Sequence, residues 1–386
     1  MSDADIASQT KTPQENLEEG RKSALYDEHV ALGAEMRNVG GYVVPKFYSD
    51  AVEEHHAVRN KVGIFDLSLM GQIRVTGPEA PSFLAHTLIS AIKPIALGKA
   101  KYTMIVQEDG GIIDDLIVYR LGINDFMLVQ NAGNFDAVLA TLQERQGGYD
   151  VEIDDRSQTR ALIAVQGPKS LDLMRKVVAE DSQEVLGKLP YFSCTILEVA
   201  GSEMIVARTG YTGEDGFELF PKSEVAAQTW RALLDGAKEF NGLPCGLACR
   251  DTLRLEAGMP LYGYELSRER TPLEVGNQSV MGPSKGHFIG RNALVNRPQP
   301  KQQLVGLKLS GSKDAETGAE VFDSEGNVVG SITSSKVSPT LGQPLAFAYI
   351  DRWLGSVGTE LTVDIDGEKQ TATVAPTPFY RRPRRK

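Results

Sequence analysis

The chain has 386 residues, of which 41% are hydrophobic and 24% are charged, a composition typical of a globular enzyme with two or three domains. Its formal net charge of −10 argues against a general nucleic-acid binder, because such a protein needs a basic surface to neutralise phosphates. No apolar run reaches the ~18 residues that indicate a membrane-spanning helix.

The first 23 residues are polar and acidic, and we expect them to form a disordered leader. They have neither the apolar core of a signal peptide nor the Arg-rich bias of a transit peptide, so the predicted location is cytoplasmic. Cys194, Cys245 and Cys249 are an odd number of cysteines, which fits a reducing compartment. No Cys or His partners complete a zinc set, so we predict buried free thiols and no bound metal.

Residues 24–295 alternate short strands with helices, which indicates an α+β fold. An apolar strand over 73–77 ends at a glycine, and a helix is predicted over 78–89. A strand over 126–129 is followed by a helix that Asn134 is expected to cap. The strand over 161–166 is again followed by Gly-Pro and a helical pattern. This recurrence predicts two related strand-helix-strand halves.

After residue 302 the pattern changes to strands joined by turns. We expect strands over 304–309, 320–322, 328–332, 345–350 and 361–365, with no long helix, and therefore a small β-barrel over 302–380. The segment 296–301 contains two prolines and is the predicted boundary. The basic tail over 381–386 is either a solvated end or a docking patch for an acidic ligand or partner.

The first candidate motif is the segment Gly110–Tyr119. Its double glycine permits a tight turn or a close approach of the backbone to a ligand. The strand that follows is strongly apolar but carries Asp114 and Asp115, which must point to opposite faces because side chains alternate along a strand. A carboxylate buried on either face needs donors, a cation or a proton. Two surface acids and one functional acid both remain possible from the pattern.

The second candidate motif is Arg208–Leu219, which carries three glycines spaced three apart. A flat ligand could approach such a loop closely, but an ordinary hairpin would have the same pattern. The motif lacks the Gly-Lys-Ser/Thr ending of a phosphate-binding loop and does not match G-x-G-x-x-G. Glu218 lies between Phe217 and Leu219, so in a strand it faces away from both.

The third candidate motif is a helix over 249–258 that ends at Gly258 with Pro260 beyond it. Arg250 and Arg254 lie four residues apart on one face, where they could bind a carboxylate of a ligand, pair with the acids of the other motifs, or form surface salt bridges. Together the three motifs predict a carboxylate-lined, glycine-flanked cleft. They do not by themselves define a reaction.

The three motifs in this order, with Ser338–Gly342 in the β module, resemble the folate-binding aminomethyltransferase family of the glycine cleavage T protein. The resemblance extends from Leu25 to Tyr380. It implies a cloverleaf of three subdomains around a central folate cleft, with a C-terminal small β-barrel. It also implies transfer of the one-carbon unit from the aminomethyl-dihydrolipoyl arm of a lipoylated H protein to tetrahydrofolate, with release of ammonia.

The resemblance also assigns expected roles to individual residues. Asp115 matches the catalytic aspartate, Glu218 the acid that hydrogen-bonds the pterin, and Arg250 a folate-contacting arginine. Other positions that match the lining of the folate and substrate pocket are Asn131, Tyr102, Met70, Tyr191, Tyr211, Tyr262, Tyr380 and Arg381.

The sequence departs from the family pattern at three places. Leu69 stands where the family usually has histidine, Tyr42 where it has tryptophan, and Ser279 lies in a segment that lacks the usual tryptophan. These departures leave open a folate-dependent demethylase that acts on a free donor such as dimethylglycine or sarcosine. A folate-binding accessory protein for iron-sulfur cluster assembly is a further alternative, but its Lys-Gly-Cys-x-x-Gly-Gln-Glu signature is not in the sequence.

Overall fold

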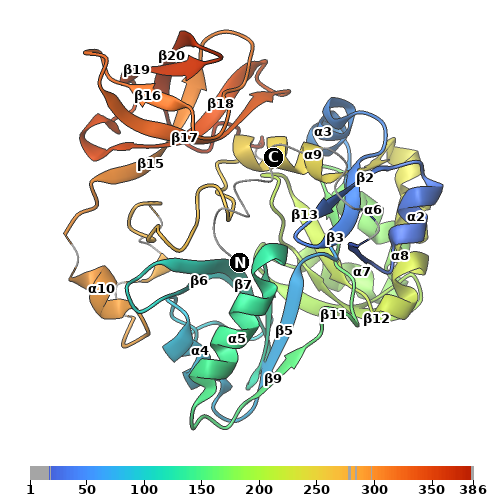
Figure 1. Cartoon of the computed structure of the whole chain (residues 1–386). Helices are drawn as coiled ribbons and strands as arrows, with labels where there is room; N and C mark the ends of the chain where they lie inside the picture. Colours follow the sequence, from blue (N-terminus) through green and yellow to red (C-terminus); the bar gives the residue numbers. More distant parts are fainter. Residues whose placement is uncertain (1–16, 18, 277–279, 283–284, 297, 384–386) are drawn as a thin grey trace.

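The computed structural model describes residues 17, 19–276, 280–282, 285–296 and 298–383. Two lobes are each built on a largely antiparallel sheet with helices on its outer face, and a closed β-barrel forms the third lobe (Figure 1). The expected α+β cloverleaf with a C-terminal barrel is therefore confirmed. Among the described residues, no helix is long and apolar enough to cross a membrane.

The first lobe contains a five-stranded sheet in the order β6-β7-β8-β5-β9. Its strands and helices are β5 (Gly71–Thr76), α4 (Ala80–Thr87), β6 (Ala100–Val106), β7 (Ile112–Gly122), β8 (Asp125–Gln130), α5 (Phe135–Gln146) and β9 (Glu152–Asp155). One face of the sheet packs on α4 and α5 through a buried apolar cluster that includes Ile73, Phe83, Leu116 and Val138.

The second lobe contains a six-stranded sheet in the order β11-β12-β13-β10-β4-β14. Its strands are β4 (Gly63–Asp66), β10 (Ile163–Gln166), β11 (Cys194–Val199), β12 (Ser202–Ala207), β13 (Gly216–Phe220) and β14 (Leu243–Pro244). Its helices are α6 (Ser170–Val177), α7 (Gln183–Lys188), α8 (Ser223–Ala237) and α9 (Leu247–Glu256). Helices α6, α7 and α8 cover one face through a cluster centred on Trp230, while α9 contributes to the opposite face.

The two sheets have matching topologies, which confirms the predicted internal repeat. In each sheet three consecutive antiparallel strands are followed by the strand that opens the repeat, β5 in one lobe and β10 in the other. Both opening strands end at a glycine with positive φ, Gly77 at 121° and Gly167 at 130°. A Cβ atom would meet a backbone oxygen at 2.5 Å in the first case and 2.6 Å in the second. The shared Gly-Pro sequence is therefore required by the close packing at each strand-helix corner.

The barrel closes in the order β15-β18-β17-β16-β19-β20 around an apolar interior. Its strands are β15 (Gln302–Leu309), β16 (Glu320–Phe322), β17 (Val328–Ser338), β18 (Gln343–Asp351), β19 (Glu360–Ile365) and β20 (Glu368–Ala375). The five predicted strands are present, and the sixth, β20, was not predicted. It begins directly after a two-residue turn with four consecutive polar residues, and only its second half alternates polar with apolar residues, so its apolar signal is weak.

The remaining elements lie at the N-terminal end and in the connections. They are β1 (Arg21–Lys22), α2 (Tyr26–Ala31), β2 (Glu35–Val39), β3 (Tyr42–Phe47), α3 (Ala51–Asn60) and α10 (Arg291–Val295). Strand β1 pairs with β3, so the last part of the predicted leader forms a short strand. Residues 1–16 and 18 of that leader, and 384–386 of the basic tail, lie outside the described residues.

The inner faces of the two sheets meet in a central buried cluster. Tyr119, Met127 and Val129 come from the first sheet, and Phe65 and Phe220 from the second. Helix α9 packs on the same cluster and also contacts β17 and β18 of the barrel. Side chains on these inner faces therefore point to the place where the lobes meet.

Candidate active site

Asp115 lies on β7, on the face shared with Ile117 and Tyr119, and is half-buried. Its Oδ2 accepts a hydrogen bond from the Tyr102 hydroxyl at 3.0 Å, and its Oδ1 accepts one from Nδ2 of Asn131 at 2.7 Å. Burial raises the pKa of Asp115 to about 6, although these two bonds and the charge of Arg250 act to lower it. Three residues expected in the site, Asp115, Tyr102 and Asn131, are thus in direct contact.

Asp114 points to the other face of β7, as the strand alternation predicted, and is fully buried beside the first lobe's apolar cluster. It accepts hydrogen bonds from the backbone N–H of Asn131 at 3.0 Å and from Nδ2 of Asn134 at 2.8 Å. Burial, followed by the charge of Asp115, raises the pKa of Asp114. Sequence reasoning missed its partner Asn134, which was expected to cap α5 but makes no side-chain capping bond.

Glu218 lies on β13 and faces the central cluster, away from Phe217 and Leu219, which pack in the second lobe's core. Its Oε2 accepts hydrogen bonds from the hydroxyls of Tyr119, at 3.1 Å, and Thr209. Burial raises the pKa of Glu218, and these two bonds and Arg250 oppose that effect. Tyr119 is on the same face of β7 as Asp115, four residues further along. Four residues of a strand span about 13 Å, so the two carboxylates face one region without touching.

Arg250 is at the start of α9, and its guanidinium lies 4.5 Å from the ring centre of Tyr211. Among the described residues its guanidinium has no hydrogen-bonded or ion-paired partner. Its charge lowers the pKa of both Asp115 and Glu218. Arg254, one turn further on, instead forms a buried ion pair with Glu265 at 2.9 Å. The two arginines of the motif therefore differ: Arg254 joins protein segments, and Arg250 is available for an anionic or carbonyl group.

A small hollow lies on the inner face of the second lobe's sheet, beside Glu218 and Arg250, and its cavity volume is about 10 Å³. Its lining residues are Phe65, Leu67, Ala164, Gln166, Tyr211, Thr212, Glu218 and Arg250. Asp115 is not among them. A volume of this order holds about one water molecule, whereas typical ligand pockets enclose about 300–1,000 Å³, so the hollow as it stands does not admit a ligand of folate size.

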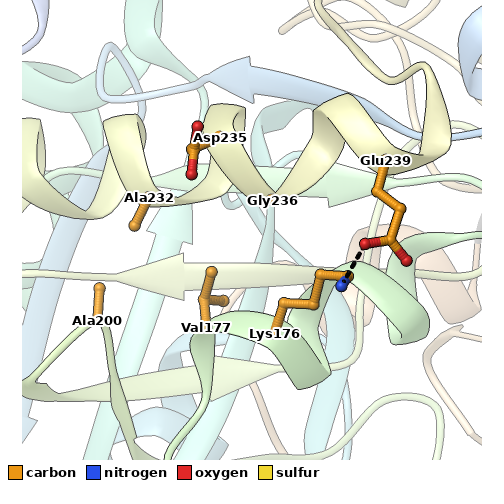
Figure 2. Close-up of a pocket in the computed structure, with 7 residues that line it drawn as sticks. All are labelled: Lys176, Val177, Ala200, Ala232, Asp235, Gly236 and Glu239. Carbon is orange, nitrogen blue, oxygen red and sulfur yellow. Dashed lines mark ion pairs between the residues drawn. The ribbon is translucent and has the colours of Figure 1, made fainter.

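A wider hollow lies on the outer surface between α6 and α8 (Figure 2). Lys176 and Glu239 form an ion pair across it at 2.6 Å, and the other lining residues are mostly small. None of its lining residues is among the predicted site residues, and the carboxylates of the central site do not reach it. We therefore place the candidate site at the meeting of the lobes.

The other predicted site residues take varied positions. Tyr211 donates a hydrogen bond to the carbonyl of Pro260, and Tyr262 donates one to the carbonyl of Ile112 at 3.1 Å. Met70 is half-buried against the central cluster, close to Leu69, which is buried there in the place of the usual histidine.

Residues near the C-terminus meet two other segments of the chain. Tyr380 lies against the guanidinium of Arg59, 4.0 Å from its ring centre to Cζ. Tyr191 is 45% exposed and has Arg382, not Arg381, near its ring. Arg382 also lies 3.8 Å from Asp215. Arg381 is exposed, and Ser279 lies outside the described residues.

The glycines of the second motif make room for protein rather than for a ligand. A Cβ atom at Gly210 would lie 2.0 Å from the side chain of Gln166, and one at Gly216 would lie 2.4 Å from it. Gln166 fills this space and donates to the carbonyl of Thr209 at 3.1 Å. A Cβ at Gly111 would similarly meet the carbonyl oxygen of Arg268 at 1.9 Å. The expectation of close ligand approach is thus replaced by close packing of the chain on itself.

The three cysteines are free and buried, as predicted. Among the described residues, Glu54, Cys245 and Cys249 form a group whose ligand atoms lie within 4.8 Å of one another. The Glu54 carboxylate already accepts backbone hydrogen bonds from Tyr48 and Gly246, and the Cys245 thiol contacts the carbonyl of Leu243. These donors and acceptors are engaged with the protein itself, so the group is satisfied without an ion.

Comparison with known proteins agrees over nearly the whole chain. Residues 25–285 match the GCVT N-terminal domain, and residues 302–381 match the glycine cleavage T-protein C-terminal barrel domain. An aminomethyltransferase of Corynebacterium jeikeium is 46% identical over 95% of this chain and 100% of its own length. One from Streptomyces coelicolor is 47% identical over 94% and 98%, respectively. The crystal structure of glycine cleavage system aminomethyltransferase T from Bartonella henselae superposes with a TM-score of 0.86, at 31% identity, over 94% of this chain and 98% of that one.

Proposed function

This chain belongs to the glycine cleavage T-protein family and is an aminomethyltransferase, and from that premise we propose its two substrates. The donor is the aminomethyl group on the dihydrolipoyl arm of a lipoylated H protein, and the acceptor is tetrahydrofolate. The methylene carbon forms two bonds to folate nitrogens while its bonds to the amine nitrogen and to sulfur break. The two protons lost from the folate nitrogens balance the ammonia and the reduced lipoyl thiol that are released. The free buried thiols support a cytoplasmic location as part of this proposal.

The observation that carries the proposal is the held carboxylate of Asp115. Both of its oxygens accept hydrogen bonds, and its pKa of about 6 leaves it ionised at neutral pH while it can still accept a proton. A negative charge fixed in this position stabilises the cationic methylene species that forms as ammonia leaves. The same carboxylate takes the proton that the folate nitrogen loses when the new bond forms.

Glu218 and Arg250 supply complementary groups for the pterin and for the rest of the folate. Both protein donors to Glu218 bond Oε2, so Oε1 is available to accept from the amino and ring N–H groups of a pterin. The guanidinium of Arg250 has donors that suit a ring carbonyl or a carboxylate. The ring of Tyr211 and the side chain of Met70 provide apolar surface for a flat ligand. Tyr262, Tyr191, Tyr380 and Arg381 remain proposed contacts of the bound substrates.

The test is ammonia release from aminomethylated H protein in the presence of tetrahydrofolate, measured for the native chain and for Asp115→Asn. General-base and electrostatic roles predict a loss of roughly 100-fold or more in kcat for this variant. Asp172→Asn, which alters an exposed carboxylate on α6, is the control and should retain native turnover. Near-normal turnover of Asp115→Asn would remove Asp115 from the mechanism.

The same assay separates the H-protein donor from a free donor. Sarcosine and dimethylglycine, supplied with tetrahydrofolate and without H protein, should give no methylenetetrahydrofolate. Turnover with either of them at a rate comparable to that with H protein would favour the demethylase alternative. Leu69, which stands in place of the usual histidine, would then be the first residue to test for a role in donor choice.

A further inference from the structure

Asp114 and Asn134 form a buried pair behind the carboxylate of Asp115. Asn134 donates through Nδ2 to Oδ1 of Asp114 at 2.8 Å. Asp114 is fully buried, and Asn134 is 9% exposed. Asp114 faces the first lobe's core, so it has no route to a substrate that occupies the space between the lobes. Any influence of this pair on the reaction must therefore act through a neighbouring residue.

Asn131 is that neighbour, because it bonds both aspartates. Its Nδ2 donates to Oδ1 of Asp114 at 2.8 Å and to Oδ1 of Asp115 at 2.7 Å, and its backbone N–H donates to Oδ2 of Asp114 at 3.0 Å. A carboxamide nitrogen carries two hydrogens, which supplies one for each carboxylate. The amide of Asn131 cannot turn toward a ligand without breaking one of these bonds.

The position of Asn134 argues for a role beyond support of helix α5. It is the N-cap residue of that helix, where an Asn side chain normally accepts a hydrogen bond from a backbone N–H of the first turn. Its side chain makes no such bond and instead donates to Asp114. The side chain of Asn134 therefore does not cap the helix. It contributes instead to the series of hydrogen bonds that links Asp114, Asn131 and Asp115.

We propose that Asp114 and Asn134 are positioning residues that fix the carboxylate of Asp115 through Asn131. This inference rests on the proposed function, because it requires Asp115 to act in the transfer. Without Asn134, Asp114 loses one of its two side-chain donors, and the amide of Asn131 loses its fixed anchor. Asp115 then keeps only Tyr102 as a firm side-chain partner. Small displacements of a reacting group cost large factors in rate.

The experiment compares Asn134→Ala with Gln146→Ala in the full-length protein. Gln146 is on the same helix and also donates an amide hydrogen bond, to the carbonyl of Val151 at 2.7 Å, but it has no link to the aspartates. Asn134→Ala should lower kcat about tenfold or more, with the KM for tetrahydrofolate changed by less than about twofold. It should also move the acid limb of the pH–kcat profile to higher pH, because the Asn131 amide is then held less firmly against Asp115 and its hydrogen bond to the charged carboxylate weakens. Gln146→Ala should leave kcat, the KM for tetrahydrofolate and the acid limb of the pH profile unchanged.

A double variant separates action through Asp115 from a general structural effect. If Asn134 acts only through Asp115, adding Asn134→Ala to Asp115→Asn leaves the residual rate unchanged to within about twofold. The inference is overturned if Asn134→Ala has native kcat, or if it lowers the rate equally in the native and Asp115→Asn backgrounds. Asn134→Ser, which keeps a hydroxyl donor, should fall between the native chain and the alanine variant and provides the same test should the latter fold poorly. Full activity of Asp115→Asn alone would instead refute the proposed function.

Discussion

At the scale of single residues, the two neighbouring aspartates of β7 show how a strand divides two tasks between adjacent positions. Asp114 is fully buried and surrounded by amide donors, while Asp115 is half-buried and is held by Tyr102 and Asn131. The pKa of both groups is raised by burial, and for Asp114 also by the charge next to it. Two adjacent carboxylates in one region do not easily ionise together. The pair therefore favours a single negative charge. Because Asp115 is the more exposed of the two aspartates, that charge lies on Asp115.

Arg250 provides a residue-scale prediction with a definite sign. Its charge lowers the pKa of Asp115, which is about 6 in the native chain. In Arg250→Met the pKa of Asp115 rises, so a smaller fraction of Asp115 is ionised at a given pH. The acid limb of the pH–kcat profile, expected near pH 6 in the native chain, should therefore move to higher pH. The KM for tetrahydrofolate should rise about tenfold or more, as expected for the loss of a charge-assisted hydrogen bond.

A control for this prediction is Arg231→Met, because Arg231 is exposed and pairs with Glu28, away from the candidate site. It should leave the pH profile and the KM unchanged. An acid limb at the same pH in Arg250→Met and in the native chain would show that Arg250 is too far from Asp115, or too well screened, to influence its ionisation.

At this scale, the sequence could predict which way a side chain points within a strand, but it could not predict contacts between residues that are far apart in the chain. Strand alternation was sufficient to place Asp114 and Asp115 on opposite faces of their strand, and Glu218 on the face opposite Phe217 and Leu219. The partners of these carboxylates could not be predicted in the same way. Asn134 is 20 residues from Asp114, and Tyr119 is 99 residues from Glu218, so each contact depends on how the strands and lobes pack. Tyr119 had one available signal, since it is four residues after Asp115 in the same strand.

At the scale of elements, helix α9 joins all three lobes. Arg250 at its start faces the candidate site, and Cys249 and Leu253 pack in the central cluster. Glu256 at its end accepts hydrogen bonds from Arg59 of α3, at 2.8 Å, and from Thr340 in the turn between β17 and β18, at 2.8 Å. These contacts are consistent with a specific Arg-Asp-Thr-Leu-Arg-Leu-Glu pattern: Thr252 and Glu256 bond residues of α3, Arg254 pairs with Glu265, and Asp251 pairs with Arg254 within the helix.

Glu256 gives a stability prediction at this scale. Burial would raise its pKa, but the hydrogen bond and charge of His55 and the charge of Arg59 together lower it to about 2. Because the pKa is lower in the folded chain than the ordinary carboxyl value, Glu256 contributes stability above about pH 4.5 and loses that contribution as the pH falls toward 2. Glu256→Gln should lower the free energy of unfolding at pH 7 by roughly 1.5–3 kcal/mol, since Arg59 loses one of two buried carboxylate partners and keeps the other, Glu214.

Urea denaturation of Glu256→Gln at pH 7 and at pH 3 measures this effect. The difference between the native chain and the variant should be smaller at pH 3, where the native chain has begun to lose the contribution of Glu256. Glu224→Gln, at an exposed position of α8, is the control and should unfold like the native chain at both values. A variant whose deficit is the same at pH 3 as at pH 7 would contradict the assigned ionisation.

Elements with strong apolar periodicity were the ones that the sequence could predict. The repeated strand, Gly-Pro and helix units in the two lobes were recognised because their apolar spacing and corner glycines recur. Strand β20 was missed because residues such as Lys369 and Gln370 interrupt its alternation. The role of the glycine-rich loop was uncertain for a different reason. Glycines at these positions would be needed equally to make room for a ligand or for the side chain of Gln166, and only the packed structure shows that Gln166 fills the space.

At the scale of the whole molecule, the barrel is attached to the two sheet lobes through α9 and the segment that follows it. Leu255 of α9 packs against Leu345 and Phe347 on β18. Glu265 accepts hydrogen bonds from Thr333 and Ser334 on β17 at 2.6 Å, while its other oxygen pairs with Arg254. The barrel therefore packs against the back of the helix whose first turn carries Arg250, and Figure 1 shows α9 between the barrel and the sheet of the second lobe.

This arrangement predicts that the strands of the barrel influence folate binding although none of them carries a residue of the candidate site. Phe347→Ala should lower the free energy of unfolding by about 3–5 kcal/mol, because it leaves a cavity where Leu255 packs. It should also raise the KM for tetrahydrofolate, because α9 loses its support and Arg250 moves with the helix. The matched comparison is Val363→Ala, which creates a cavity inside the barrel, away from α9. Chemical denaturation and steady-state kinetics should show a loss of stability in both variants and a change in KM only in Phe347→Ala. An equal KM in the two variants, at temperatures where both are folded, would mean that the position of α9 is fixed by the sheet lobes alone and that the barrel serves another purpose.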